Sequence, residues 1–552
     1  MEIKLSGRRV RFNPGDRVYD LLSPTEQKKY ILCRLSRGVK ELGYRLSARD
    51  DGRSVYLLGV KNKEACKAYE ATLRFLLLVA FHRLYPGVRV QFSYHVSRAV
   101  YCEALTPDFN MFDAVPALRA EMERLVAANL PIERVSMTRE EAENFFRAAG
   151  RDDQLELLAM RPENRLHLYR CDGYTDDLHT LMAPGTGCLS SYRLMPFSPG
   201  LILQYPRYEL SGGMPDFTEE NTYARSLYEA TRFAGRTGLS GVPGINRAAR
   251  TNPTDFILMC EARHTDQLAQ LGEQIAGGGK NAANIRLVAI AGPSSSGKTT
   301  FCHRLRVELL SRGMTPVMIS LDNYYREKEE ICRIQGRDEA HLDLEDLCCL
   351  DTERFNRDMF ALIAGDPVTL PYFNFQTRRR EEGPTVRADA QSPIMIEGIH
   401  ALNERLTESI SRHQKYKIYI APQAQLNLDC HTPLSTTDLR LLRRLIRDMK
   451  FRNSPAENTL TMWQSVRAGE FKWIYPTQEG ADFVFNSFLW YELCVIRKQA
   501  LPALMAVPQG HPQRLAAERL CEYLSYFVPL EDESAIPGSS ILREFLGGSC
   551  FR

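Results

Sequence analysis

The sequence predicts an α/β fold for its second half, in which a parallel sheet is covered by helices on both faces. From Arg286 onward, apolar runs such as RLVAIAG, SPIMIEG and YKIYIAP alternate with helical segments such as TTFCHRLRVELLSRG. Continuous apolar runs are typical of strands that are buried on both faces, as in a parallel sheet. The first half instead has short alternating segments divided by turn residues, which predict smaller β-rich and mixed modules.

Length, charge and cysteine usage narrow the class of protein. The chain has 552 residues, enough for several domains, because a single hydrophobic core stops growing well below this length. A formal net charge of only +3 gives no bulk attraction to nucleic acid or to an anionic membrane. The 14 cysteines form no C-x-x-C pair, and the apolar stretches fall short of the roughly 20 residues that a membrane span needs. We therefore expect a cytoplasmic protein with reduced thiols and no membrane partner.

Changes in texture along the chain predict where its domains begin and end. Segments near the N-terminus alternate like strands and are divided by turns such as Asp50-Asp51-Gly52. Further on, TREEAENFFRAAG predicts a helix with Thr138 as its N-cap and Gly150 as its stop signal. The predicted regions are a β-rich module at 1–63, an α+β domain at 64–221, a helical connector at 222–279, the α/β domain at 280–495 and a helical extension at 496–552.

A glycine-rich loop follows the first apolar strand of the α/β domain. The stretch GPSSSGKT fits the pattern G-x-x-x-x-G-K-[ST], and a predicted helix with an apolar stripe follows it. In such a loop the backbone N–H groups surround phosphate oxygens, the lysine reaches the terminal phosphates and the hydroxyl after it binds Mg²⁺. The loop therefore predicts binding of a nucleoside triphosphate with Mg²⁺. The predicted contacts are Gly292, Pro293, Ser294, Ser295, Ser296, Gly297, Lys298, Thr299 and Thr300.

Two carboxylates end later strands of the same predicted sheet. Asp322 follows TPVMISL, and Glu397 ends PIMIE. At the carboxyl edge of a parallel sheet, an aspartate can accept the proton of an attacking hydroxyl, and a glutamate can hold Mg²⁺. Asp322 could instead simply cap the loop that follows its strand. No N-K-x-D motif occurs in the α/β domain, which argues against a GTPase.

A run of arginines follows between Asp438 and Phe451. In DLRLLRRLIRDMKF the residues Arg440, Arg443, Arg444 and Arg447 fall at i, i+3, i+4 and i+7, on one face of a helix. Such a face is often only solvated. In a chain that also carries the glycine-rich loop and both carboxylates, we favour a clamp that stabilises the charge on a phosphoryl group during its transfer.

These segments together resemble the uridine kinase/phosphoribulokinase family over roughly Leu287 to Ser487. The stretches SLDNYYR, HLDLEDLCCLD, PYFNFQTRRR, IMIEGIHAL, RLLRRLIRD and ADFVFN follow in the order and spacing of that family. The resemblance implies ATP-dependent phosphorylation of a ribose-type hydroxyl, with Asp322 as the base and Lys298 and Arg447 acting on the phosphoryl group. It also implies phosphate contact by Arg444, and acceptor contacts by Tyr325, Asp343, Phe373, Arg378 and Arg452.

The match departs from the family where a nucleobase would bind. Family members carry a tyrosine and a histidine at the positions of Phe373 and Arg378, and both touch the pyrimidine. Phe373 has no hydroxyl, and Arg378 places a fixed cation where the family has an imidazole. A site that depends on hydrogen bonds to a base is sensitive to such losses. The resemblance therefore implies a nucleoside or related acceptor without fixing the base.

The first half resembles the front part of threonyl-tRNA synthetases. Residues 1–63 are similar to the ubiquitin-like β-grasp TGS module, and residues 64–221 to the second additional domain that carries an editing site. The stretch YRCDGYTDDLHTLMAPGTG is the clearest likeness. The H-x-x-x-H pair of that domain is absent, and its later ligands correspond to His179 and Met182. Because one imidazole cannot hold zinc, we expect His179 to be a surface or packing residue.

Two classes of function stay open at this point. The first is a kinase whose acceptor is a nucleoside or another small sugar-containing alcohol. The second is an RNA- or tRNA-binding regulatory protein in which ATP acts as a switch, with Arg8, Arg9 and Arg11 as the basic contact surface. The sequence identifies no interface, although members of the kinase family often associate into homo-oligomers.

Overall fold

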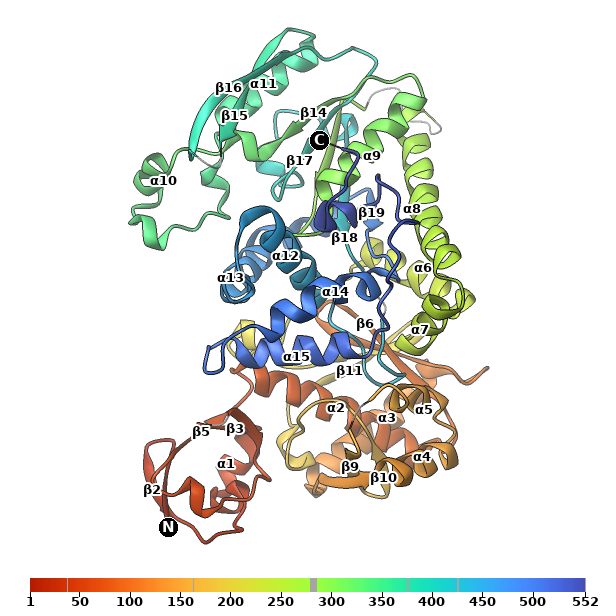
Figure 1. Ribbon diagram of the computed structural model, residues 1–552, viewed down its shortest axis with the longest axis vertical. Coiled ribbons are helices and arrows are strands. Elements are labelled where there is room, and N and C mark those ends of the chain that lie inside the picture. The colour runs from red at the N-terminus through yellow and green to blue at the C-terminus, as the bar shows by residue number, and fades with distance from the viewer. Residues whose placement is uncertain (37, 162, 278–284, 375–376, 424–425, 552) are drawn as a thin grey trace. The chain divides into compact units, whose positions relative to one another are not determined.

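The chain forms two compact units in the computed structural model, which describes residues 1–36, 38–161, 163–277, 285–374, 377–423 and 426–551. The first unit comprises Met1–Glu220, Ser240–Pro243 and Gln425–Leu434. The second unit comprises Asn221–Leu239, Gly244–Ala424 and Ser435–Arg552. Figure 1 labels most of the helices and strands of both units.

An N-terminal sheet opens the first unit. Its strand order is β2-β1-β5-β3-β4, in which β1 runs parallel to β5 and antiparallel to β2. Ile3 and Leu5 alternate with exposed residues along β1, so one face of the strand packs into a core with Phe12 and Val55. The elements are β1 (Glu2–Leu5), β2 (Arg8–Arg11), α1 (Pro24–Lys29), β3 (Leu32–Leu35), β4 (Gly38–Glu41) and β5 (Ser54–Leu58).

A larger α+β part completes the first unit around a long central helix. Helix α2 is buried over most of its length, and Asn62 caps its start by accepting from the N–H of Glu64 at 3.0 Å. The predicted N-cap at Thr138 is confirmed, because its hydroxyl accepts from the N–H of Glu141 at 3.2 Å. The sheets have the orders β11-β12-β7-β6 and β10-β9-β8. The elements are α2 (Lys63–Leu84), β6 (Val90–Val96), β7 (Ala99–Ala104), α3 (Met111–Ala128), β8 (Glu133–Thr138), α4 (Arg139–Ala148), α5 (Asp152–Leu158), β9 (Arg165–Cys171), β10 (Tyr174–Asp176), β11 (Arg193–Phe197) and β12 (Gly200–Gln204).

Two short segments from later in the chain belong to the first unit. The inserted loop, residues 426–434, is tied to strand β6 because the side chain of Asn427 donates to the carbonyl of Phe92 at 2.6 Å. The N–H of Phe92 in turn donates to the carbonyl of Cys430 at 2.8 Å. The N–H of Val242 donates to the carbonyl of Asn427 at 3.0 Å. The predicted boundaries placed both segments in other regions, because backbone pairing by so few residues leaves no periodic pattern in a sequence.

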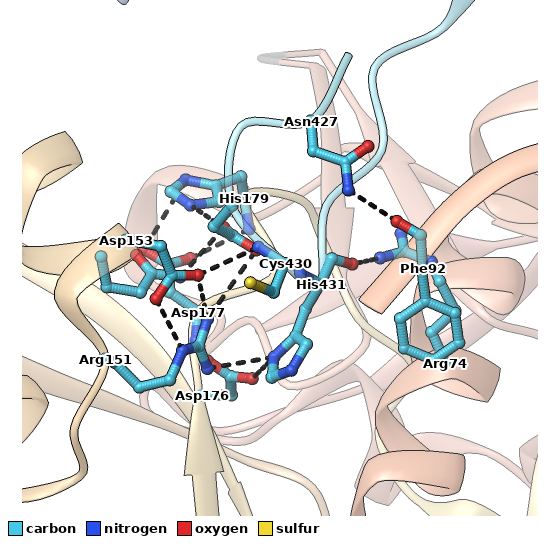
Figure 2. Close-up of polar contacts among 12 residues, drawn as sticks. Arg74, Phe92, Arg151, Asp153, Asp176, Asp177, His179, Asn427, Cys430 and His431 are labelled. Carbon is cyan, nitrogen blue, oxygen red and sulfur yellow. Dashed lines mark hydrogen bonds and ion pairs between the residues drawn. The ribbon is translucent and has the colours of Figure 1, made fainter. Parts of the chain in front are cut away.

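A buried polar cluster holds the inserted loop, as Figure 2 shows. The Asp429 carboxylate is fully buried and lies 3.0 Å from Nε2 of His179, and it accepts from Gln154 at 2.9 Å. Arg151 pairs with Asp176 at 3.1 Å. His179 was expected at the surface or in packing, but its side chain is only 2% exposed and is bonded to carboxylates. Across the described residues, no group of three His, Cys, Asp or Glu side chains could hold a metal ion.

The charge state of His179 predicts how the stability of the first unit depends on pH. Burial alone would lower the pKa of His179, but the charge of Asp177 and the hydrogen bond to Asp429 outweigh it and raise the pKa above 6.5. The folded state therefore binds this proton more tightly than the unfolded state. Its contribution to stability is present below about pH 6.5 and is lost as the pH rises through the raised pKa.

We expect His179→Gln to make the free energy of unfolding of the first unit less dependent on pH. His413→Gln is the control, because His413 is exposed and lies in the second unit, and it should leave the pH dependence unchanged. Urea unfolding followed by far-UV circular dichroism reports both units. The three tryptophans, Trp463, Trp473 and Trp490, lie in the second unit, so their fluorescence reports that unit separately. If the free energy of unfolding of His179→Gln depended on pH as steeply as that of the parent chain, the raised pKa of His179 would not be the cause of the pH dependence.

The second unit contains the predicted parallel sheet, which is confirmed. Its strand order is β14-β17-β13-β18-β19, and every neighbouring pair is parallel. All five residues of β13 are buried, as expected for a strand covered on both faces. A separate antiparallel hairpin is formed by β15 (Val368–Asn374) and β16 (Arg379–Val386). The sheet strands are β13 (Leu287–Ala291), β14 (Val317–Ser320), β17 (Ile394–Glu397), β18 (Lys415–Ala421) and β19 (Phe483–Asn486).

Helices from the predicted connector and C-terminal extension pack with this sheet domain. Helix α8 (Pro253–Ala276) lies alongside α9 (Lys298–Ser311) in Figure 1, and Arg304 donates to Thr265 at 3.2 Å between them. The predicted boundary at 279/280 lies outside the described residues. None of the described helices is long and apolar enough to cross a membrane. The remaining helices are α6 (Asn221–Thr237), α7 (Val242–Thr251), α10 (Lys328–Gln335), α11 (Thr352–Ala364), α12 (Thr436–Arg452), α13 (Ala456–Gly469), α14 (Glu492–Met505), α15 (Arg514–Ser525) and α16 (Arg543–Leu546).

Candidate active site

The glycine-rich loop joins β13 to helix α9. Ser295 (φ 60°) and Gly297 (φ 92°) are in the left-handed region, which turns successive N–H groups toward one side of the loop. A Cβ on Gly292 would lie 2.0 Å from the carbonyl oxygen of Ile420, so the close passage of β18 requires glycine there. The loop and the first turn of α9 therefore form a concave row of donors that suits phosphate.

Polar side chains of the loop are also suited to an anion. The Lys298 ammonium donates to the carbonyls of Gly292 at 2.9 Å and Pro293 at 3.2 Å, which holds its charge at the loop. The hydroxyls of Ser295 and Ser296 are buried, and neither has a hydrogen-bond partner among the described residues. Buried polar atoms are normally paired, so these two hydroxyls fit a site that takes a polar ligand.

The two predicted carboxylates follow neighbouring strands at the same edge of the sheet. Ser320 and Glu397 are register partners on β14 and β17, and the Ser320 hydroxyl donates to Glu397 at 2.7 Å. Asp322 lies in the turn directly after β14. Strand β17 also pairs with β13, which leads into the loop. The topology thus brings Asp322, Glu397 and Lys298 together, as the sequence predicted from strand ends alone.

Electrostatics confirm that these charges act on one another. Desolvation by neighbouring protein atoms raises the pKa of Asp322. The positive charges of Lys298 and Arg452 oppose this shift, and part of the Asp322 side chain stays open to solvent. Burial, the charge of Asp322 and to a smaller extent that of Glu544 raise the pKa of Glu397. A carboxylate whose pKa is raised by a neighbouring carboxylate belongs to a site in which a bound cation would be stabilised.

The donor set fits Mg²⁺ in particular. Thr299 is exposed at the start of α9, and Glu397 is partly open to solvent. Mg²⁺ prefers oxygen ligands and keeps several waters, so one hydroxyl and one carboxylate suffice when a substrate's phosphates supply the rest. Thr299 and Glu397 would hold the ion, which would neutralise charge on the phosphates.

The arginines of helix α12 fall into two groups. Arg440 and Arg443 are buried and paired with Glu470 and Glu492, and both donate to backbone carbonyls of the loop, with Arg440 Nη1 3.1 Å from the carbonyl oxygen of Ser294. A solvated arginine face is therefore wrong for these two. They hold the shape of the loop, a role that the sequence did not indicate.

The other arginines lie nearer to solvent around one acid. Arg444 donates to the hydroxyl of Ser294 at 2.8 Å and pairs with Asp448 at 3.1 Å. Arg447 and Arg452 pair with the same Asp448 at 3.1 and 3.4 Å, and the Arg452 side chain is 57% exposed. Asp448 thus forms ion pairs with all three arginines that the sequence analysis assigned to phosphate and acceptor contact.

Residues predicted for the acceptor lie on the elements after β14. Tyr325 donates to the carbonyl of Leu344 at 3.2 Å, and its ring lies 5.9 Å from that of Phe373 on β15. Asp343 pairs at 3.0 Å with Lys472, a residue that sequence reasoning missed. Arg378, at the tip of the β15–β16 hairpin, is largely exposed and lies 3.7 Å from Glu339.

Comparison with known proteins identifies a family that part of the second unit resembles. Residues 287–490 match the model of the phosphoribulokinase / uridine kinase family. The predicted resemblance of the C-terminal region to this family is confirmed. The chain is 28% identical over 199 residues to a uridine kinase of Staphylococcus epidermidis, which covers 36% of this chain and 86% of that enzyme.

Two further proteins are similar to part of this chain. It is 29% identical over 180 residues to threonine–tRNA ligase 1 of Bacillus subtilis, covering 32% of this chain but only 27% of the ligase. A solved structure described as a possible uridine kinase from Bacillus stearothermophilus is 19% identical, with a TM-score of 0.27, and covers 40% of this chain and 98% of that one.

A glycine substitution tests the packing of the loop. A Cβ on Gly297 would lie 2.3 Å from Cγ2 of Ile541, whereas Gly313, which has a similar φ of 82°, has open space around it. Gly313→Ala should therefore cost only the strain of the left-handed conformation, about 1–2 kcal/mol. We expect Gly297→Ala to cost more in urea unfolding followed by tryptophan fluorescence. Ile541→Ala should cost less in the Gly297→Ala background than in the parent chain, because it relieves the clash. Equal costs for the two glycines would contradict the contact.

Proposed function

We propose that the chain is an ATP- and Mg²⁺-dependent kinase that transfers the γ-phosphate to a hydroxyl of a nucleoside. The observation that carries the proposal is the convergence of Lys298, Asp322 and Glu397 at the carboxyl ends of adjacent parallel strands. Ligands bind at this edge of open α/β sheets, and phosphoryl transfer needs a phosphate cradle, a cation and a base there. The family match over 287–490 supports the same reaction class.

The residues would divide the work as follows. The free backbone N–H groups of the loop and of the first turn of α9, together with the Lys298 ammonium, would hold the phosphates, and Arg444 and Arg447 would stabilise the charge that spreads over the transferred group. Asp322 would take the proton of the acceptor hydroxyl while that oxygen bonds to the γ-phosphorus and the bond to ADP breaks. The raised pKa of Asp322 makes its carboxylate a stronger base than a solvated aspartate.

The acceptor contacts favour a sugar over a particular base. Asp343, Tyr325 and Arg452 offer a carboxylate, a phenolic oxygen and a cation to hydroxyl groups, whereas Phe373 offers a base only an apolar face. Discrimination between bases needs buried hydrogen bonds. We infer a nucleoside acceptor with weak base preference, and we place the reaction in the cytoplasm.

An ADP-release screen tests the function. Purified protein, ATP and Mg²⁺ are incubated with ribonucleosides, deoxyribonucleosides and free sugars, and monophosphate products are identified by mass spectrometry. We expect turnover with at least one nucleoside. Binding of ATP without any phosphorylated product across the panel would contradict the kinase assignment.

Substitution of the base gives the sharpest prediction. Asp322→Asn should lower kcat by about 10² to 10⁴, the usual contribution of an acid–base group, and leave ATP binding intact. Asp338→Asn is a matched control, because Asp338 is a surface aspartate with 70% of its side chain exposed. Stopped-flow turnover and calorimetric ATP binding separate the two effects. A kcat unchanged in Asp322→Asn would contradict its role.

A second candidate, supported by the similarity to threonine–tRNA ligase, is RNA binding by the first unit with ATP as a switch. The N-terminal sheet would then correspond to the TGS module and the α+β part to the second additional domain. The predicted basic surface gives it little support, since Arg8 pairs with Glu26 at 2.6 Å and Arg11 with Glu2 at 3.4 Å. Binding of tRNA that weakens steeply with salt would favour this candidate, and no binding at low salt would contradict it.

A further inference from the structure

The C-terminal segment, residues 536–551, is built into the second unit. Ile541, Leu542, Phe545 and Leu546 are at most 3% exposed. Ser540 donates to the buried Glu261 at 2.5 Å, and Lys450 of helix α12 donates to the carbonyl of Leu546. In this structure the segment is therefore packed against the elements around the loop.

The same segment touches the phosphate-binding loop at two places. Ile541 packs so closely on Gly297 that no side chain would fit between them. One helical turn onward, the Glu544 carboxylate accepts from the N–H of Thr300 at 3.1 Å. The ring of Phe545 lies 5.2 Å from the guanidinium of Arg443, which braces the loop. One short segment thus contacts the loop, the helix that follows it and the arginine that shapes it.

The Thr300 amide is one of the groups that a phosphate would use. It belongs to the first turn of α9, where N–H groups have no acceptor within the helix. These amides, together with those of the loop, form the anion site. A carboxylate oxygen and a phosphate oxygen are acceptors of the same charge, so they cannot share this N–H. Glu544 therefore holds a position that the phosphates of a nucleotide need.

We propose that the C-terminal segment is an autoinhibitory element in which Glu544 occupies a phosphate position on the Thr300 amide and ATP binds only after Glu544 has left. This inference rests on the proposed function, because it concerns the same nucleotide site. The apparent affinity for ATP is then reduced by the fraction of molecules in which Glu544 is bound. Any partner or condition that draws the segment away from the loop activates the enzyme.

Two substitutions of Glu544 test the element in the full chain. Glu544→Gln keeps the shape and removes the charge, and Glu544→Ala removes the acceptor as well. Glu533→Gln is the matched control, because Glu533 lies near the same segment, 3.7 Å from Arg543, and no contact joins it to the loop among the described residues. Calorimetric titration with ATP and Mg²⁺ gives the dissociation constants, and thermal unfolding verifies that the variants are folded.

We expect both Glu544 variants to bind ATP about fivefold to 150-fold more tightly than the parent chain, the range of typical coupling between competing states. The control should match the parent. Hydrogen exchange in residues 540–551 of the parent should increase when ATP is added. Equal ATP affinity in the parent and both Glu544 variants overturns this inference and leaves the kinase assignment standing.

Two other outcomes also decide the matter. If Glu533→Gln tightens ATP binding as much as Glu544→Gln, general loosening of the segment explains the effect and the Glu544 contact is not inhibitory. If neither the parent nor any variant binds a nucleoside triphosphate, the inference and the proposed function both fail.

Discussion

The buried pair of Arg443 and Glu492 is the interaction on which the nucleotide site depends. Both side chains are fully buried, with 2.6 Å between Nη2 of Arg443 and the carboxylate. The same guanidinium donates to the carbonyl of Ser487 at 2.7 Å and to those of Ser295 and Ser296 at 3.4 Å. One cation thereby joins helices α12 and α14, the end of β19 and the loop. Removing either partner would leave an uncompensated buried charge, which costs about 3–5 kcal/mol.

The rigidity of this arrangement explains how a loop of small residues keeps a defined shape. Serines and glycines lose much conformational freedom on folding and contribute little buried apolar surface. The loop is therefore held from outside, by Arg440 and Arg443 on one side and by the passage of β18 past Gly292 on the other. Shape complementarity to phosphate thus comes from neighbouring elements as much as from the motif itself.

Sequence reasoning located residues correctly where one residue type in one local context has one preferred position. The motif at Gly292–Thr299 and the carboxylates at the ends of β14 and β17 are of this kind, because strand ends fix position at the edge of the sheet. Sequence reasoning could not distinguish the role of Arg443 from that of Arg444. Neighbouring arginines on one helix look alike in sequence. Only the tertiary partners show that one is paired with the fully buried Glu492 and that the other is hydrogen-bonded to the hydroxyl of Ser294. Lys472 and Glu544 were missed for the same reason.

The inserted loop affects how the chain can be divided. It departs after β18 and returns before α12, two elements of the second unit, while its own residues belong to the first unit. A C-terminal fragment that begins near residue 221 would contain Asp429 and His431. It would lack Gln154, Asp176 and His179, which bind these two side chains and balance their charges. The first unit therefore needs residues that lie within the sequence of the second half. Because of this, evolution could not exchange either unit intact by cutting the chain at one point.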